Sequence, residues 1–208
     1  MSIKDMFEAV LAFKANRVVE LVKEEVAGGT EISSILNDGL ISAMDEVGRR
    51  FATGEIFVPE MLRSAKAMKA GLEVLKPFLS SSDAQSTGTV IIGTVKGDLH
   101  DIGKNLVAMM LEGAGFEVVD IGFNVETEVF LQTAEEKNAD IICLSALLTT
   151  TMPAMEAVVA AVREKGLKYK SMVGGAPVTE AFAQEIGADG YAVDAAGAVK
   201  IARELVSV

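Results

Sequence analysis

Histidine and cysteine are almost absent from this chain, which has one of each in 208 residues. The lone histidine, His100, excludes every site that needs two imidazoles from one chain. The lone cysteine, Cys143, excludes a disulfide within the chain, which indicates a reducing cytoplasm. Because Cys143 lies in the apolar run 141–144, we interpret it as a buried, unreactive thiol.

Positive charge and long hydrophobic runs are also scarce. The chain has 19 Lys and Arg residues and 30 Asp and Glu residues, and the resulting charge of −11 argues against a nucleic-acid surface. No apolar run approaches the ~20 residues that cross a bilayer. Charges at Lys4, Asp5 and Glu8 leave no apolar signal-peptide region at the amino terminus. We therefore expect a soluble cytoplasmic protein without a nucleic-acid or membrane partner.

Three common functional motifs are missing. Gly97 and Gly103 precede Lys104 at the wrong spacing for a phosphate-binding P-loop, and Asn105 stands where that loop has Ser or Thr. No Gly-x-Gly-x-x-Gly follows the first expected strand, so a nicotinamide site is unsupported. Ser145 lacks the flanking glycines of a nucleophile elbow, which argues against a serine hydrolase.

Hydrophobic residues are plentiful, at 50% of the chain, and their spacing differs between two halves. In the first part they recur at helical spacing. The clearest faces are Val18, Val22 and Val26; Leu40, Met44, Val47 and Phe51; and Met61, Ala65, Met68, Leu72 and Leu75. Gly28 and Gly29 predict a helix end, and Pro59 predicts the first turn of another helix. We predict a four-helix-bundle domain over residues 1–82.

The second half alternates short apolar runs with amphipathic segments. Residues 83–88 are polar and without periodicity, which predicts a linker, and a second domain is predicted over 89–208. Continuous apolar runs suit strands buried on both faces. Strands are expected at 90–95, 117–121, 140–144, 170–173 and 190–193, and helices at 101–114, 126–134, 153–162, 179–186 and 195–206. The fold class is α/β, with a doubly wound, flavodoxin-like five-stranded parallel sheet that binds ligands at its carboxyl edge.

His100 lies just past the first expected strand, in the segment Gly97-Asp98-Leu99-His100-Asp101-Ile102-Gly103. Asp98 can accept a hydrogen bond from one ring nitrogen, which would set the tautomer and raise the basicity of a metal-bound imidazole. The alternative is a loop histidine paired with a carboxylate for no catalytic purpose.

Two further segments favour a ligand site over this alternative. Ser145-Ala146-Leu147 ends the third expected strand, and Gly174-Gly175 ends the fourth. There are 41 residues between Gly103 and Ser145 and 26 between Leu147 and Gly174.

With these segments and separations the chain resembles the cobalamin-binding corrinoid proteins of methyltransferase systems, of the methanol and methylamine type, and the cobalamin module of methionine synthase. The resemblance implies that His100 binds the cobalt of methylcobalamin or a related corrinoid. It implies that Asp98 and Thr151 continue this contact as a proton relay. The implied cofactor-binding residues are Gly97, Asp98, Leu99, His100, Asp101, Ile102, Gly103, Ser145, Leu147, Thr149, Gly174 and Gly175. For Thr149 to Thr151, capping of the next helix is the alternative.

The resemblance extends to residues 48–59 of the helical half, which look like the segment that caps the upper corrin face. It implies that Phe51 and Val58 lie over the methyl group, and the alternative is that both belong to the core of the bundle. Residues 80–88, which include the linker, would then be the hinge that lets this cap move aside.

The function implied is a methyl carrier, which is non-catalytic alone. Cobalt would accept a methyl group from a substrate-specific methyltransferase and pass it to tetrahydrofolate or a thiol on a methylcorrinoid:acceptor methyltransferase. A reductive activase would be a third partner. Two alternatives stay open: the cobalamin-binding subunit of an adenosylcobalamin mutase, and a cobalamin sensor or store.

Overall fold

The computed structural model describes residues 3–79 and 87–207, which form two compact units. One unit is built on Met1–Ser86 and the other holds Thr87–Leu111 and Phe116–Val208. Most of the predicted linker, residues 83–86, lies outside the described residues, so the domain boundaries and the hinge stay predictions.

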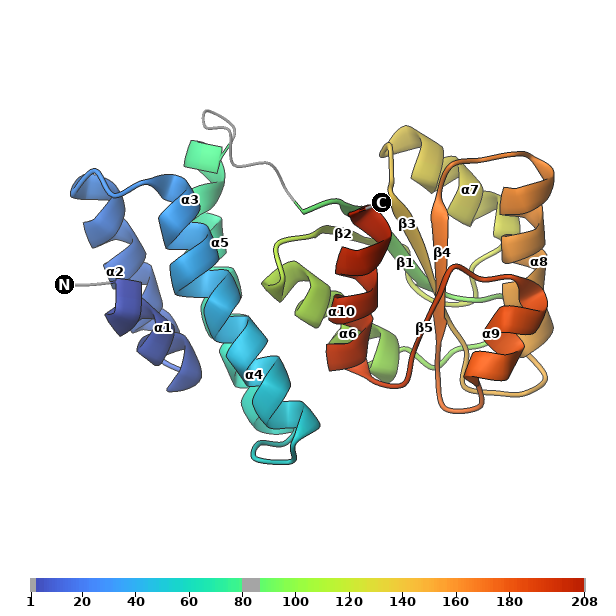
Figure 1. Ribbon diagram of the computed structural model, residues 1–208, viewed down its shortest axis with the longest axis horizontal. Helices are drawn as coiled ribbons and strands as arrows, with labels where there is room; N and C mark the ends of the chain where they lie inside the picture. Colours follow the sequence, from blue (N-terminus) through green and yellow to red (C-terminus); the bar gives the residue numbers. More distant parts are fainter. Residues whose placement is uncertain (1–2, 80–86, 208) are drawn as a thin grey trace. The chain divides into compact units, whose positions relative to one another are not determined.

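The first unit is helical, as predicted (Figure 1). Its elements are α1 (Ile3–Leu11), α2 (Ala15–Ala27), α3 (Ile32–Ser34), the π-helix η1 (Ile35–Ile41), α4 (Ser42–Ala52) and α5 (Val58–Leu79). Because α3, η1 and α4 follow one another without a break, residues 3–79 form four helical rods. The predicted breaks are confirmed, since α2 ends before Gly28 and Pro59 lies in the first turn of α5.

Nine of the twelve residues on the expected apolar faces are buried in the core of this unit, and Val26, Phe51 and Leu72 are partly buried. Val18, Leu40, Met61 and Leu75 are each fully buried. The helices α1, α2, α4 and α5 pack against one another along these faces. Burial of a Val, Leu or Met side chain contributes about 1.5–3 kcal/mol to folding stability, so these apolar residues hold the helices together.

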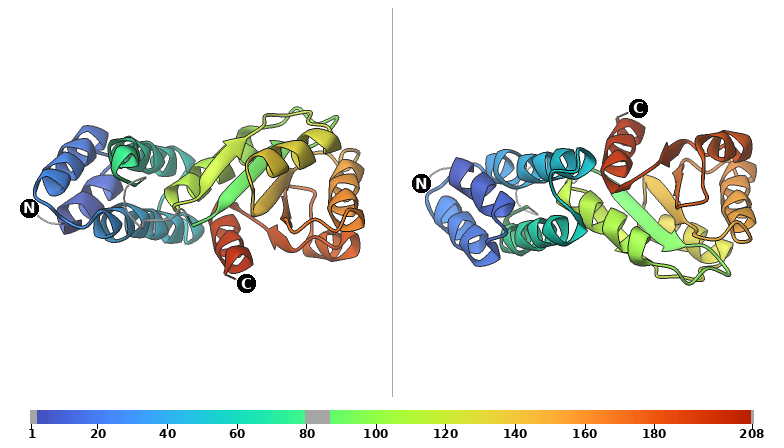
Figure 2. Two further views of the ribbon diagram at one scale, coloured as in Figure 1. Left: turned by 90° about the horizontal axis from the view of Figure 1, so that it is seen from above. Right: turned by 90° about the horizontal axis from the view of Figure 1, so that it is seen from below.

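The second unit is the predicted doubly wound sheet. Its strands are β1 (Thr89–Thr94), β2 (Glu117–Asp120), β3 (Ile141–Ser145), β4 (Lys170–Gly174) and β5 (Gly190–Ala192), all parallel in the order β2-β1-β3-β4-β5. Its helices are α6 (Ile102–Gly113), α7 (Thr127–Glu136), α8 (Met152–Glu164), α9 (Glu180–Ile186) and α10 (Ala195–Val206). Helices α7, α8 and α9 cover one face of the sheet, and α6 and α10 lie on the other (Figure 1 and Figure 2).

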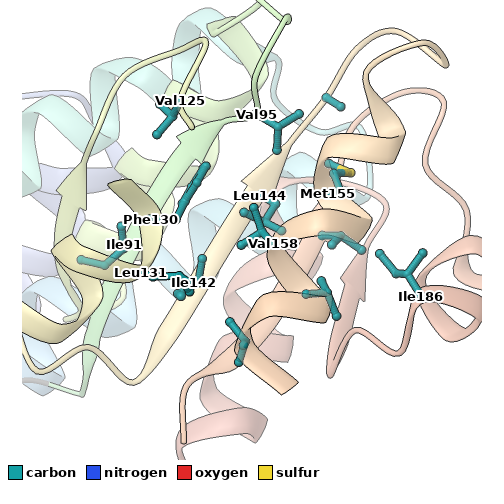
Figure 3. Close-up of a cluster of buried hydrophobic side chains, with 14 of the residues drawn as sticks. Ile91, Val95, Val125, Phe130, Leu131, Ile142, Leu144, Met155, Val158 and Ile186 are labelled. Atoms are coloured by element: carbon teal, nitrogen blue, oxygen red, sulfur yellow. The ribbon is translucent and has the colours of Figure 1, made fainter. Parts of the chain in front are cut away.

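The face under α7, α8 and α9 carries a continuous hydrophobic core (Figure 3). Phe130 of α7 and Val158 of α8 pack with Ile91 and Ile142 of the central strands. Cys143 of β3 is buried, as predicted, and burial raises the pKa of its thiol, as for an unreactive cysteine. A rigid sheet therefore supports the loops at its carboxyl edge.

Candidate functional site

The predicted site residues of the second unit gather at the carboxyl edge of the sheet, where the strand order reverses. Strands β1 and β3 are neighbours there, but their following helices leave on opposite faces. Doubly wound sheets bind ligands at such a point. The strand ends are in register across the edge, with Thr94 beside Ser145 and Ser145 beside Gly174. Residues that are distant in the sequence therefore meet at one edge.

Asp98 is the centre of the hydrogen-bond network at this edge, and it is fully buried. Its Oδ1 accepts from the backbone N–H of His100 at 3.0 Å and lies 2.7 Å from His100 Nδ1. Its Oδ2 accepts from the backbone N–H groups of Leu147 at 2.7 Å and Leu148 at 3.3 Å, and from Thr151 Oγ1 at 2.7 Å. The carboxylate thus joins the loop after β1 to the loop after β3.

The hydrogen bonds to Asp98 set its charge state. Burial alone would raise the pKa of this carboxyl, because it disfavours the charged form. The donors from Thr151, Leu147 and His100 outweigh burial and hold the pKa well below its ordinary value. Asp98 is therefore an anion at neutral pH, and the proton that it shares with His100 belongs on Nδ1.

This pKa shift predicts how the stability of the protein depends on pH. A carboxyl whose pKa is lowered by folding stabilises the fold above its unfolded pKa of about 4, and the stabilisation is lost as pH falls below that value. Urea unfolding across a pH series should show the stability difference between the wild type and Asp98→Asn shrinking at acidic pH. A difference that is constant with pH would show that the charge of Asp98 does not stabilise the fold.

His100 presents its other ring nitrogen outward. Its side chain is 50% exposed, although its partner Asp98 is fully buried. Within residues 3–79 and 87–207, Nε2 makes no hydrogen bond, and with the proton on Nδ1 it carries a lone pair. The buried Thr94 donates a hydrogen bond from Oγ1 to the His100 carbonyl oxygen at 2.9 Å, which holds the loop from the β1 side. This arrangement suits a single metal ligand.

Thr151 belongs to the network with Asp98, and the capping alternative is wrong for this residue. It occupies the N-cap position of α8, but its side chain makes no capping hydrogen bond. The hydroxyl lies 2.7 Å from Asp98 Oδ2 and 2.8 Å from the Leu148 carbonyl oxygen. One hydroxyl proton serves one acceptor at a time, so Thr151 can donate to either oxygen.

The four predicted glycines differ in backbone conformation and in the space that a Cβ atom would have. Gly97 has φ 83°, a backbone conformation that favours glycine. A Cβ on Gly103, at the start of α6, would meet no atom within 4 Å, so the space beside it is open to a ligand. Gly174 ends β4, and a Cβ there would lie 3.3 Å from the Ala192 carbonyl oxygen. At Gly175 a Cβ would lie 1.9 Å from the Ala146 carbonyl oxygen.

Gly175→Ala is therefore expected to destabilise the protein strongly. The residue has φ 133°, and its Cβ would clash with the backbone of the loop after β3. We expect a loss of about 2–3 kcal/mol in urea unfolding. Gly166→Ala is a matched control, because Gly166 also has a positive φ of 61° but nothing lies within 4 Å of its Cβ position. Equal losses in the two variants would contradict the clash.

Exposed apolar side chains gather at the same edge. Of the ten large hydrophobic side chains that are exposed among the described residues, six lie here: Leu99, Ile102, Phe123, Leu147, Leu148 and Val193. Exposed apolar surface on this scale marks a binding surface. The sequence predicted Leu99, Ile102 and Leu147, and it missed the others because single apolar residues in loops carry no periodic signal.

Lys104 is a further residue that the motif analysis did not assign. Its side chain is 1% exposed, and its ammonium pairs with Asp120 and donates to Asn105 Oδ1 at 2.7 Å. The pair joins the first turn of α6 to the end of β2. A buried charge survives only when paired, so this contact also holds the segment that carries His100.

Four of the predicted residues have side chains outside the hydrogen-bond network of Asp98 and His100. Thr149 is exposed, and Asp101 accepts a hydrogen bond from Asn105 in the first turn of α6. Phe51 lies half-buried in α4, and Val58 begins α5 with 40% of its surface exposed. Both belong to the helical unit, so their role over a corrin stays a prediction.

Comparison with known proteins identifies the family. Residues 88–200 and residues 2–76 each match a family described as a B12 binding domain. The chain is 44% identical to the dimethylamine corrinoid protein 1 of Methanosarcina acetivorans over 208 residues, which cover 99% of this chain and 97% of that protein. The chain belongs to the B12-binding corrinoid proteins.

Two solved structures share this architecture. A chain of the methanol:cobalamin methyltransferase complex MtaBC from Methanosarcina barkeri superposes with a TM-score of 0.87 at 32% identity, covering 99% of this chain and 79% of that one. A cobalamin-binding protein from Desulfitobacterium hafniense superposes with a TM-score of 0.81 at 31% identity, covering 98% of each chain. These matches confirm the predicted resemblance and fold class.

The carboxyl edge of this corrinoid protein fits its cofactor. A neutral imidazole nitrogen can bind a metal ion such as cobalt, and Nε2 of His100 is directed away from Asp98 on a half-exposed side chain. A macrocycle needs apolar contact, and Leu99 and Ile102 are exposed on either side of His100. No helix in the described part of the chain is long and apolar enough to span a membrane.

Proposed function

We propose that this corrinoid protein carries a methyl group between two methyltransferases. The observation that carries the proposal is the pair of buried Asp98 and half-exposed His100 at the carboxyl edge of the sheet. It is supported by the relatives, one a dimethylamine corrinoid protein and another a chain of a methanol:cobalamin methyltransferase complex. When bound, the corrinoid supplies a cobalt centre that accepts and releases a methyl group.

His100 would hold the cobalt through Nε2, and Asp98 would orient it. An anionic Asp98 keeps the shared proton on Nδ1, so that Nε2 presents its lone pair. A hydrogen bond from a metal-bound imidazole to a carboxylate also raises the basicity of the ligand. The strength with which His100 would hold the cobalt would thus depend on where this proton lies.

Thr151 would extend this pair into a short relay. While Asp98 is an anion, the Thr151 hydroxyl donates to it. If Oδ1 of Asp98 took the proton from Nδ1, Oδ2 would still accept from the Thr151 hydroxyl, which can also turn to the Leu148 carbonyl oxygen 2.8 Å away. No other side chain needs to move, so protonation of Asp98 is coupled to the ligand at little structural cost.

The other predicted residues would surround the cofactor. Gly103, Gly174 and Gly175 would let its nucleotide tail approach the backbone, and Ser145 and Thr149 would offer hydroxyls to it. Leu99, Ile102 and Leu147 would contact its apolar parts. Phe51 and Val58 of the helical unit would exclude water from the methyl group.

The partners we propose are a substrate-specific methyltransferase on the donor side, a methylcorrinoid:acceptor methyltransferase and a reductive activase. The acceptor would be tetrahydrofolate or a thiol. We place the protein in the cytoplasm, in keeping with its single, buried cysteine.

The test is a transfer assay on the full chain. The apoprotein is loaded with methylcobalamin that carries a ¹³C-methyl group, and coenzyme M is added with a methylcobalamin:coenzyme M methyltransferase. Labelled methyl-coenzyme M should form from the protein-bound cofactor. Tight binding of adenosylcobalamin without methyl transfer would instead indicate a mutase subunit, and binding without transfer of either group would indicate a sensor or store.

A further inference from the structure

Asn124 contacts the backbone around Asp98 from a separate part of the chain. It lies in the loop between β2 and α7, 27 positions from Gly97. Its Oδ1 accepts a hydrogen bond from the Gly97 backbone N–H at 2.8 Å. Its own backbone N–H donates to the Asp98 carbonyl oxygen at 3.0 Å. Asn124 therefore binds both residues, Gly97 through its side chain and Asp98 through its backbone.

This segment needs such a restraint. Gly97 has φ 83°, and glycine gives the chain before Asp98 more conformational freedom than any other residue would. The hydrogen bond from Asp98 to Val95 and that from Thr94 to His100 both come from the β1 side. Asn124 adds a restraint from the loop after β2, so the Gly97–Asp98 segment is held from β1 and from this loop.

The backbone of Asn124 suits this role. Its φ of 53° lies in the left-handed region, which asparagine adopts more readily than most residues. In that conformation its backbone N–H and side-chain oxygen both reach the Gly97–Asp98 segment. A side chain that lacks an acceptor would leave the Gly97 N–H without this partner.

We propose that Asn124 is a positioning residue, which holds Asp98 where its Oδ1 accepts from Nδ1 of His100. The inference rests on the proposed function only in that this histidine is the one assigned to cobalt. Loss of the Asn124 side chain would let the Gly97–Asp98 segment shift. The proton of His100 would then distribute between the two ring nitrogens, and fewer molecules would present Nε2 as an acceptor.

The experiment measures the tautomer of His100 in the apoprotein, because the chain has a single histidine and its imidazole signals need no assignment. ¹⁵N spectra of histidine-labelled protein are recorded at about pH 9, where a histidine side chain is neutral. The wild type should show mainly the Nδ1–H form. Asn124→Gly keeps the positive φ but removes the acceptor, and the ratio of Nδ1–H to Nε2–H should fall about threefold to tenfold, as for one lost hydrogen bond.

Two further variants complete the test. Asn124→Asp keeps an acceptor at Oδ1 and should retain the wild-type ratio. Asn138→Gly is the matched control, because Asn138 has a φ of 49° and is exposed in the turn between α7 and β3, at the opposite edge of the sheet. A ratio unchanged in Asn124→Gly, or changed equally in Asn138→Gly, would overturn the proposal. A ratio as low in Asn124→Asp as in Asn124→Gly would overturn it as well.

Titration with hydroxocobalamin separates this inference from the proposed function. If the protein binds the corrinoid through His100, Asn124→Gly should show a reduced histidine-dependent spectral change, and Asn124→Asp should not. If no corrinoid binds to any variant, the proposed function fails, but the tautomer ratios in the apoprotein still decide the role of Asn124.

Discussion

Replacing His100 with glycine is expected to abolish the histidine-dependent spectral change on titration with methylcobalamin. The chain has no second imidazole, so no other histidine can take its place. Changes to residues behind a metal ligand cost about 10- to 100-fold in affinity, and loss of the ligand should cost about 100-fold or more. Absorption spectra of the purified apoprotein, titrated with methylcobalamin, measure both the histidine-dependent spectral change and the affinity.

Added imidazole provides the control for this variant. Glycine leaves space beside Asp98 that free imidazole can enter, and the spectral change should return as imidazole is added. A variant with the wild-type spectrum and affinity would refute the assignment of His100 to cobalt. A variant that stays altered despite added imidazole would indicate that the loop, rather than the ligand, was lost.

Replacing Asp98 with asparagine is expected to destabilise the protein by about 3 kcal/mol. Both carboxylate oxygens accept hydrogen bonds, and an amide has one oxygen and an NH₂ group that would face the donors from Leu147 and Thr151. A buried donor left without an acceptor costs about 1–3 kcal/mol. Urea unfolding at neutral pH measures the loss.

Asp38→Asn is the matched control, because Asp38 is exposed in η1 and the substitution should change stability by no more than about 0.5 kcal/mol. In the corrinoid titration, Asp98→Asn keeps His100 but replaces the anionic acceptor for Nδ1 with a neutral amide oxygen, and affinity should fall by about tenfold or more. Stability equal to the wild type would show that Asp98 is not the structural centre of the edge.

The sequence by itself predicted the fold and the principal residues of the site. Strands buried on both faces read as continuous apolar runs, so 90–95 and 140–144 predicted β1 and β3 to within one residue at each end. A single histidine two residues from Asp98 predicted the contact between them, which the structure contains, since contacts this local need no knowledge of the tertiary structure.

Only the tertiary structure decided which distant residues hold this pair. Thr151 lies 53 positions from Asp98 and looked equally suited to capping α8. Thr94, Lys104 and Asn124 were not predicted, because a strand end, a helix turn and a loop become neighbours only when parallel strands align their ends. Local spacing thus determines the elements and the Asp98–His100 pair. The register between strands determines which side chains orient it, and that register arises from packing over the whole sheet.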